Sequence, residues 1–507
     1  MNAPEGLPTS SAAEAGLDYS GKWKAFSAIA ISFVTMVMSI SMVFVALSAI
    51  ADDFGITLRA VTWVVVVQAL TISALMMPMG RLADIVGWKR IHLIGLLLFG
   101  GGSVFVALAP TFGLLIVARV VMAAGSAMGQ SVGTAMVVSV FPPTERGMAI
   151  GSQTTAVAIG GASGPVVGGL VLQVLPWEAL FLMIVVPIGI AFVAGFLILD
   201  EKRMRREERP RGSTFDWFGA LLSAIAVIIL VITINNPLGL PWASPAILGS
   251  LLSVVLLLAV FVRWELRSKH PMLELRLFRN TVVSLSLIAR LLGFMGATAS
   301  RFLMPVYLIS LRGMEAGAAG SVLFLTSLGM GLAAQASGRL SDRFGSRPFA
   351  VLGFALLLLT SVPMALLESD SALPFVALLL FVNGLGTGLW GTPNSSVILG
   401  SVPPSSLGVV AALTNLTRNI GNVFGQAIAS GVVVAVMAAG GFDIPLSEVG
   451  NSPAAAGAFI DGWRVAFLLV AVYAVVGLVL ALATKPSKGE PAPATPATRR
   501  APGVAAP

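Results

Sequence analysis

The chain has 507 residues, of which 57% are hydrophobic and only 11% are charged, and its mean hydropathy is +0.94. Soluble globular proteins carry roughly 25% charged residues, so this composition excludes a soluble protein and indicates an integral membrane protein. The formal net charge of +8 would also suit a nucleic-acid-binding protein, but the positions of the basic residues argue against a nucleic-acid partner. The chain has no cysteine, which excludes disulfides and thiolate metal sites.

Apolar runs of membrane length recur from one end of the chain to the other. About 20 apolar residues can cross a bilayer as a helix. The runs are too long for barrel strands, and helices satisfy their own backbone polar groups in hydrocarbon. The sequence therefore predicts an all-α integral membrane protein with about fourteen transmembrane helices. They are expected near residues 25–50, 61–80, 91–109, 112–136, 148–172, 179–199, 217–235, 246–264, 281–309, 318–337, 349–367, 374–398, 409–439 and 464–484.

The two ends of the chain differ from the apolar runs. The first 24 residues are small and polar, and no short apolar core with a cleavage site precedes the first full-length run, so a cytoplasmic segment is expected and not a secretory signal. The tail after Lys485 is rich in Pro and Ala and is expected to be disordered.

The basic residues lie mainly on one side of the predicted bundle. Of the 31 Lys and Arg residues, 24 fall in the termini and in the connecting segments on that side, whereas the opposite segments hold only Arg59, Arg312 and Arg464. An even number of spans places both termini on one side, and the positive-inside rule makes that side cytoplasmic. Segment 200–216 is the most basic connection, with Lys202, Arg203, Arg205, Arg206, Arg209 and Arg211.

A short phrase occurs twice, 258 positions apart, each time between two apolar runs. It reads GRLADIVGWKR at 80–90 and GRLSDRFGSR at 338–347, after the second and the tenth predicted spans. A repeated loop of this kind indicates a duplicated bundle, in which spans 1–6 and 9–14 form two halves related by a parallel repeat and spans 7 and 8 are an inserted pair.

This repeat predicts the division of the chain. The expected parts are a cytoplasmic N-terminal segment (1–24), an N-terminal six-helix bundle (25–199), a basic cytoplasmic linker (200–216), an inserted helix pair (217–264), a second cytoplasmic linker (265–280), a C-terminal six-helix bundle (281–484) and a disordered cytoplasmic tail (485–507).

The fifth predicted span carries glycines at regular spacing. Gly160, Gly164 and Gly168 are four residues apart and share one helix face, where another helix can approach closely. Pro165 permits a bend, and Gly169 completes the string.

Three features of the sequence resemble motifs of the major facilitator superfamily, and within it of the fourteen-span drug/proton antiporter group, which includes multidrug-efflux proteins. The repeated phrase resembles the cytoplasmic signature loop of the superfamily, the glycine string resembles its antiporter motif, and Arg119 matches an arginine of its fourth span. The family has a Gln three residues after that arginine, whereas this chain has Met122. Weaker matches at 215–219, 304–308 and 415–421 favour the fourteen-span group.

The resemblance implies roles for these motifs. In the family the aspartate of the phrase, here Asp84, lies against a helix N-terminus of the other half and latches the cytoplasmic side closed; the alternative is a tight basic turn with no such role. The latch candidates are Gly80, Asp84, Gly87, Lys89, Arg90, Gly338, Asp342 and Arg343. The glycine string is the candidate gating motif, with ordinary small-residue packing as the alternative.

The chain departs from the antiporter group in its acids. Ser39 stands where the group usually has an aspartate in span 1, and all 23 Asp and Glu residues fall in termini, loops or span edges. Both histidines, His92 and His270, are expected on the cytoplasmic side. Proton coupling, which needs a group that binds and releases a proton, would then use a peripheral acid or titration of the substrate itself. The candidate acids are Asp52, Asp53 and Glu178, with plain loop acids as the alternative.

Four arginines lie within the predicted spans, where an unpaired cation is unfavourable. Arg290 and Arg301 are 11 residues apart on the ninth span, so they share a face about 16 Å apart. One interpretation is a cavity that attracts an anionic or zwitterionic group; the other is that each arginine binds backbone carbonyls. Arg119 and Arg418 would either add to the same field or bind carbonyls.

The candidate substrate-binding residues combine these cations with polar, aromatic and adaptable side chains. They are Arg290, Arg301, Ser39, Met42, Gln153, Tyr307, Trp390 and Asn394. For Met42, Tyr307 and Trp390, packing against lipid or other helices is the alternative.

The sequence thus predicts a secondary transporter of a bacterial inner (plasma) membrane that exports small amphipathic or hydrophobic compounds by alternating access, with protons as the candidate coupling ion. The alternative is a carrier of an organic anion or lipid without a membrane-buried coupling acid. No phosphate loop and no buried cluster of His or acids supports an enzyme, a cofactor or a metal site. The expected partners are the lipid bilayer and the substrate, and the expected state is a monomer.

Overall fold

The computed structural model describes residues 19, 21–204, 214–236, 240–241, 244–268, 271–403, 406–442 and 444–484. Most of the predicted N-terminal segment, most of the basic linker 200–216, His270 and the tail 485–507 lie outside the described residues.

The described chain is helical and contains no strand, and fourteen of its helices are long and apolar enough to cross a membrane, which confirms the prediction. The long helices are α2 (Lys22–Asp53), α4 (Trp63–Val86), α5 (Trp88–Ala107), α6 (Phe112–Val140), α7 (Arg146–Leu172), α8 (Glu178–Ile198), α10 (Trp217–Asn235), α11 (Pro245–Glu265), α12 (Thr281–Pro305), α13 (Ala316–Phe344), α14 (Arg347–Ala365), α15 (Leu373–Gly400), α16 (Leu407–Ala439) and α17 (Pro453–Ala483). The short elements are α3 (Leu58–Val61), α9 (Glu201–Met204), the 3₁₀ turns η1 (Pro143–Glu145), η2 (Leu275–Arg279) and η5 (Leu446–Asn451), and the π-helix η3 (Val306–Leu311), which continues α12.

Local signals set the helix ends. Thr111 and Ser452 accept hydrogen bonds from backbone N–H groups of the first turns of α6 and α17. Gly87 (φ +124°) ends α4 and Gly345 (φ +82°) ends α13, and both conformations favour glycine. Because Ser452 is followed by Pro453 at the first helical position, α17 begins eleven residues before the predicted span 464–484, and Arg464 lies inside this helix instead of in a loop.

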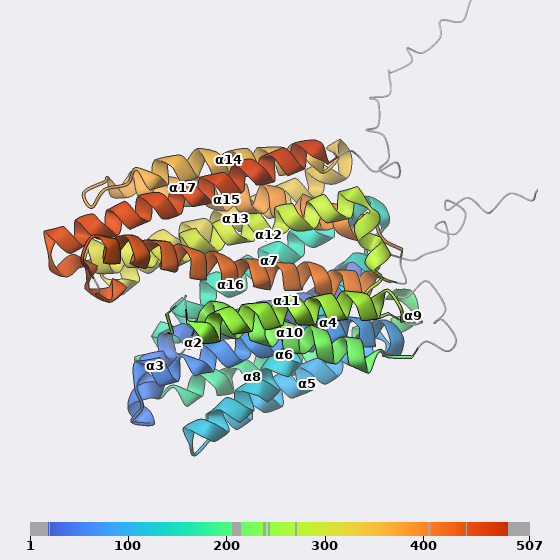
Figure 1. Ribbon diagram of the computed structural model, residues 1–507. Helices are drawn as coiled ribbons and strands as arrows, with labels where there is room; N and C mark the ends of the chain where they lie inside the picture. The colour runs from blue at the N-terminus through green and yellow to red at the C-terminus, as the bar shows by residue number, and fades with distance from the viewer. Residues whose placement is uncertain are drawn as a thin grey trace, which may run out of the picture.

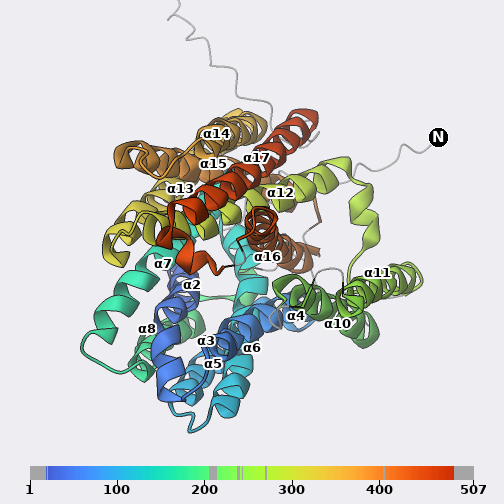
Figure 2. The ribbon, with the colours of Figure 1, turned by 60° about the vertical axis from the view of Figure 1, so that its left-hand side comes forward.

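The long helices pack in two groups (Figure 1). We call α2 and α4–α8 the N-terminal half, and α12–α17 the C-terminal half. The helices α10 and α11 pack against each other at the side of the molecule, where α10 packs on α4 and α11 lies farther out (Figure 2). The two halves meet mainly where α7 packs on α13 and α4 packs on α16.

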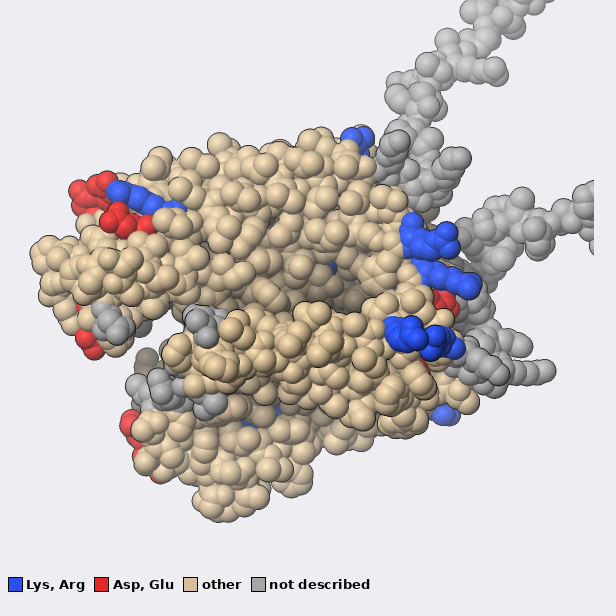
Figure 3. Space-filling view, in the orientation of Figure 1, with Lys and Arg blue, Asp and Glu red and all other residues tan. Residues whose placement is uncertain are grey.

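The apolar cores show that the halves are joined at one end only. One cluster of buried residues contains Met76 and Trp88 of the N-terminal half together with Val409 and Ala412 of the C-terminal half. At the other end each half has its own separate cluster. Figure 3 shows a hollow between the halves that opens at this other end, whereas Lys and Arg residues gather at the joined end. We call the joined end the basic end and the other the open end.

Candidate functional site

The first copy of the repeated phrase places a carboxylate of one half against a helix of the other half. The Asp84 carboxylate accepts backbone hydrogen bonds from Gly408 at 3.1 Å and Val409 at 2.9 Å, in the first turn of α16. Trp88 donates its indole N–H to the same carboxylate at 2.9 Å. First-turn N–H groups have no partner within their own helix and form the positive end of its dipole, so they stabilise a buried carboxylate. The contact that the resemblance implies for Asp84 is present.

The second copy makes the same contact in the opposite direction. The Asp342 carboxylate accepts hydrogen bonds from the backbone N–H groups of Gly147 at 2.7 Å and Met148 at 2.9 Å, in the first turn of α7. Since α7 and α16 are the fifth helices of their halves, the two carboxylates form a symmetric pair of bridges at the basic end.

The glycines of the phrase allow the helices to approach. A Cβ at Gly80 would stand 2.5 Å from the Cβ of Ala412, and a Cβ at Gly338 would clash with the backbone carbonyl of Gly147. Any larger residue at Gly80 or Gly338 would therefore push α4 from α16, or α13 from α7.

The basic residues of the phrase do not join the bridges. Lys89 donates its ammonium protons to the carbonyls of Phe196 at 2.8 Å and Leu199 at 2.6 Å, at the end of α8 in its own half. Arg90 and Arg343 are exposed. A residue that the sequence analysis missed, Glu201, accepts hydrogen bonds from the backbone N–H groups of Trp88 and Lys89 at 2.9 and 2.8 Å, and so caps α5.

The glycine string of the fifth span lies against the first span. Cβ atoms at Gly160 and Gly164 would stand 2.5 Å from the carbonyl oxygen of Val34 and 2.8 Å from that of Met38, both on α2. Gly168 lies beside Met42 of the same helix. Pro165 is exposed and Gly169 has no neighbour within 4 Å of a built Cβ, so these two residues lie outside the contact.

A layer of polar side chains joins the halves below the hollow. Asn415 of α16 donates to the carbonyl of Gln130 at 3.0 Å and to the hydroxyl of Thr134 at 3.2 Å, both on α6. Gln153, a predicted substrate-binding residue, donates to the same Thr134 hydroxyl at 2.8 Å. Arg418 donates to the side-chain oxygen of Gln130 at 3.2 Å.

The four intramembrane arginines have different surroundings. Arg119 is fully buried within the N-terminal half, donates to Gln68, and lies over the ring of Phe181 at 5.6 Å. Arg290 is 5% exposed and donates to the carbonyl of Thr414 at 2.9 Å and to the hydroxyl of Ser395 at 2.7 Å. Both thus bind groups of their own half, and for Arg290 the carbonyl-binding alternative is the one observed.

Arg301, by contrast, is exposed. Its guanidinium Nη2 lies 3.3 Å from the sulfur of Met330 on α13, and within the described parts of the chain it has no oxygen acceptor. Arg290 and Arg301 therefore differ in burial along α12: the first is enclosed in the C-terminal half, and the second is exposed.

Five predicted substrate-binding residues are buried in helix packing. Ser39, Met42 and Trp390 are at most 1% exposed, and Trp390 lies between Phe294 and Phe354 with ring centroids 5.1 Å from each. Asn394 donates to the carbonyl of Ser286 at 2.9 Å, and the fifth, Tyr307, is fully buried. A substrate in the hollow does not reach these side chains in this conformation, because neighbouring helices already occupy their surfaces.

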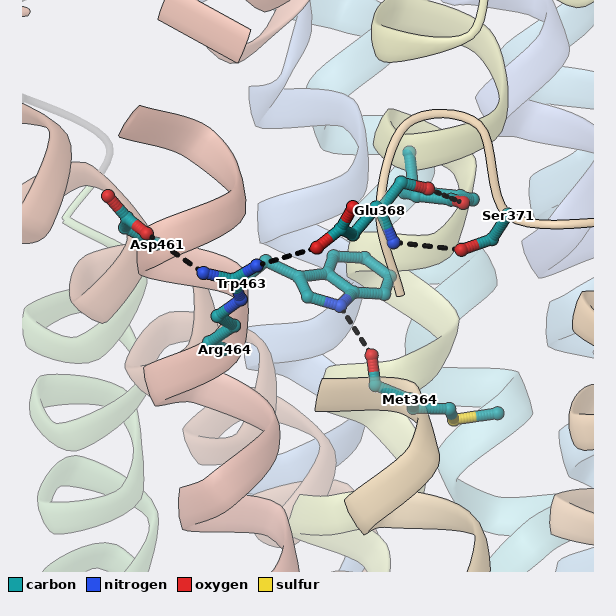
Figure 4. Close-up of polar contacts among 7 residues, drawn as sticks. Met364, Glu368, Ser371, Asp461, Trp463 and Arg464 are labelled. Atoms are coloured by element: carbon teal, nitrogen blue, oxygen red, sulfur yellow. Dashed lines mark hydrogen bonds and ion pairs between the residues drawn. The ribbon is translucent and has the colours of Figure 1, made fainter. Parts of the chain in front are cut away.

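Tyr307 belongs to a structural cluster at the open end of the C-terminal half. Its hydroxyl donates to the carbonyl of Glu368 at 2.5 Å, and its ring lies 5.0 Å from that of Trp463. Figure 4 shows the rest of this cluster: Arg464 binds the carboxylates of Glu368 at 3.2 Å and Asp461 at 3.4 Å, and Trp463 donates to the carbonyl of Met364 at 2.6 Å. These contacts tie α17 to the connection between α14 and α15.

The candidate coupling acids lie at the open end. Asp52 and Asp53 are exposed at the end of α2, and Asp53 accepts the indole N–H of Trp177 at 3.2 Å. Glu178 begins α8, is half-buried, and has one carboxylate oxygen, Oε2, without a hydrogen-bond partner among the described residues. His92 is fully buried in α5. The described chain contains no cluster of His, Asp or Glu that could hold a metal ion.

Two six-helix halves that are joined by reciprocal carboxylate bridges define a class of membrane transporters. The chain belongs to the Major Facilitator Superfamily, and the sequence pattern of that family matches residues 29–426. The riboflavin transporter RibZ of Clostridioides difficile is 30% identical over 410 residues, which cover 81% of this chain and 88% of that protein. The multidrug resistance protein Stp of Mycobacterium tuberculosis is 30% identical over 397 residues, 78% of this chain and 73% of that protein. The crystal structure of the human organic anion transporter MFSD10 has the same fold, with a TM-score of 0.65, 14% identity, and coverage of 89% of this chain and 99% of that one.

Proposed function

We propose that this superfamily member is a secondary transporter that exports small amphipathic compounds by alternating access. The observation that carries the proposal is the hollow between the halves, which opens at one end and is closed by symmetric cross-half contacts at the other. A duplicated bundle that is closed at one end by reversible polar contacts suits a carrier that rocks about a central site.

The charge distribution supports the orientation. Lys and Arg residues gather at the basic end, which the positive-inside rule assigns to the cytoplasm. The structure then represents an outward-facing state, with the cytoplasmic side closed and both termini in the cytoplasm. The bacterial relatives support a location in a bacterial plasma membrane.

Asp84 and Asp342 are the proposed latch of this state. Each carboxylate binds two first-turn N–H groups of the other half, and these hydrogen bonds must break before the basic end can open. Gly80 and Gly338 permit the close packing on which the latch depends.

The substrate class is inferred from the relatives and from the composition of the helices. One relative is named for multidrug resistance and another for transport of riboflavin, a ring system with a polar side chain. We propose substrates of this amphipathic kind, and export as the direction.

Protons are the proposed coupling ion, and Glu178 is the favoured coupling acid. Its Oε2 atom is buried without a hydrogen-bond partner among the described residues, whereas Asp53 already accepts the indole N–H of Trp177. Asp52 and Asp53 are more exposed and weaker candidates.

Flux in proteoliposomes tests the proposal. Uptake of amphipathic dyes into vesicles with the basic end outside should saturate, show counterflow, and rise when the lumen is acidic. Passage without saturation or counterflow would indicate a channel and contradict the carrier. Glu178→Gln should abolish the response to the pH gradient while counterflow continues; an unchanged response would reject Glu178 as the coupling acid.

A further inference from the structure

Two arginines from different helices of the C-terminal half lie within membrane spans near the contact between the halves. Arg301 of α12 is exposed, and Arg418 of α16 is half-buried. The helices that carry them pack against each other, and about one turn from each arginine Thr298 of α12 donates to the side-chain oxygen of Asn422 of α16 at 2.7 Å. Figure 3 shows the colour of Lys and Arg inside the hollow. The feature is thus a pair of like charges at membrane depth.

The surroundings of Arg301 place it between the halves and not toward lipid. Its guanidinium contacts Met330 of α13, a helix that packs on the N-terminal half through α7. Its own helix, α12, packs on α16, whose Arg418 donates to Gln130 of the N-terminal half. A cation in this position is accessible to a solute in the hollow.

Within the described part of the chain, no acid pairs with either of these two arginines. The described acids lie near helix ends or in connecting segments, apart from Asp461, which is paired with Arg464 at the open end. Arg301 contacts a sulfur, and Arg418 contacts one neutral amide oxygen. Arg290, by comparison, is buried and donates to Thr414 and Ser395 of its own half, so a solute does not reach it in this conformation. Two incompletely satisfied cations within membrane spans attract an anion.

We propose that Arg301 and Arg418 form a binding site for the anionic group, such as a carboxylate, sulfonate or phosphate, of a transported amphiphile. This inference rests on the proposed transport function and names its substrate class. The anion binds both guanidinium groups by charge-assisted hydrogen bonds.

The site also couples binding to the contact between the halves. The hydrogen bond from Arg418 to Gln130 joins α16 to α6, and an anion competes with Gln130 for the same guanidinium. Binding therefore removes one hydrogen bond between the halves, which favours the rocking that transport requires. Asn415 retains its own hydrogen bonds to α6.

Binding and flux of two dyes with one ring system test the site: fluorescein as the anion and a rhodamine ester as the cation. Arg301→Met and Arg418→Met should each weaken fluorescein binding, measured by anisotropy in neutral detergent, about tenfold or more. Rhodamine ester flux should stay within about twofold of the wild type. Arg301→Lys should retain part of the fluorescein binding because it keeps the charge.

Two further variants control for charge and position. Gln130→Glu should pair with Arg418 and reduce fluorescein binding, although it changes no arginine. Arg312→Met removes a cation from the end of the π-helix that continues α12, where the guanidinium donates to the carbonyl of Ser371 at 2.7 Å, and should leave fluorescein binding unchanged.

The outcomes separate the site from the transport function. Fluorescein binding without flux would support the site and contradict the proposed transport. Flux of both dyes with equal losses in the arginine variants would overturn the site and leave transport standing, and so would the absence of fluorescein binding to the wild type. If added phosphatidylglycerol displaces fluorescein and glycerol phosphate does not, the natural ligand is a lipid headgroup; displacement by both identifies a soluble anion as sufficient.

Discussion

At the scale of single residues, the four intramembrane arginines differ in what satisfies each guanidinium. Arg119 and Arg290 donate to acceptors of their own half, and Arg418 donates to one acceptor in the other half. Arg301 contacts the sulfur of Met330 and has no oxygen acceptor among the described residues. The same residue type is thus structural in two places and available to a ligand in two others. The difference can be measured as stability.

Arg290→Ala should destabilise the protein far more than Arg301→Met. Removal of Arg290 leaves the carbonyl of Thr414 and the hydroxyl of Ser395 without their donor in a buried place, a loss of about 2–4 kcal/mol. Arg301→Met removes an exposed charge and should cost less than about 1 kcal/mol. Thermal unfolding in detergent, followed by tryptophan fluorescence, measures both; equal shifts of the midpoint would contradict the assignment.

Asp84→Asn should slow transport without preventing membrane insertion. The amide has the shape of the carboxylate but loses the charge that favours the N-terminus of α16, which is worth about 0.3–2 kcal/mol. Initial rates of dye uptake in proteoliposomes should fall several-fold at equal protein content. Wild-type flux in this variant would reject the latch.

For the intramembrane arginines, the sequence predicts which helix face each side chain lies on but not which residues it contacts. The spacing of Arg290 and Arg301 placed both on one face of α12, yet the acceptors of Arg290 come from α15 and α16, more than 100 positions away. The same limit applies to Trp390 and Tyr307, because a lone aromatic in an apolar run gives no sign of whether it faces a cavity or a neighbouring helix. The repeated phrase was more informative, since two copies of one acid in equivalent loops imply equivalent contacts.

At the scale of helices, close packing of α7 on α2 depends on three glycines at four-residue spacing. Their Cβ positions are filled by backbone and side-chain atoms of α2, most tightly at Gly164, which lies against Ser41 and Met38. Here the sequence predicted the contact face correctly, because the period of the glycines equals the period of a helix face. It did not identify α2 as the partner.

Gly164→Val should separate α7 from α2 and destabilise the N-terminal half. The added atoms meet the backbone of Met38, which cannot move aside, and the expected cost is about 1–3 kcal/mol. The matched control is Gly169→Val on the same helix, where a Cβ has no neighbour within 4 Å. Thermal midpoints of the two variants should differ clearly; a similar small effect at both positions would mean that α7 and α2 do not pack as described.

Two further features, the π-helix η3 and the start of α17, could not be predicted from the apolar runs of the sequence. The π-helix η3 follows Pro305 inside the ninth span, and nothing in the hydrophobic pattern marks it. The early start of α17 was signalled by Ser452 and Pro453, but the polar residues around Arg464 hid it. Length and hydropathy thus fix the number of spans, and the caps decide where they end.

At the scale of the whole molecule, the two halves are held together unequally at their two ends. The basic end has a shared apolar cluster and two carboxylate bridges, whereas the clusters at the open end stay within their halves. The bridges run in opposite directions, from α4 to α16 and from α13 to α7, so weakening both should release the basic end evenly. A basic end that is closed by few polar contacts should open measurably more often when they are removed.

A cysteine placed under the bridges should report this release. The chain has no native cysteine, so Ser152→Cys introduces a single thiol. Ser152 is 8% exposed on α7, where its hydroxyl donates to the side-chain oxygen of Gln335 on α13 at 3.1 Å. An impermeant maleimide applied at the basic end should label this thiol slowly. The combined Asp84→Asn and Asp342→Asn changes should speed labelling roughly fivefold or more, because each lost charge shifts the equilibrium toward a state that is open at the basic end. The control variant, Arg343→Cys, places a thiol at a position that is exposed in this structure and should label quickly in both backgrounds. If the double change leaves the labelling rate of the Ser152→Cys thiol unaltered, the two bridges do not govern access from the basic end, and closure must then depend on the apolar contact of α4 with α16 and of α13 with α7.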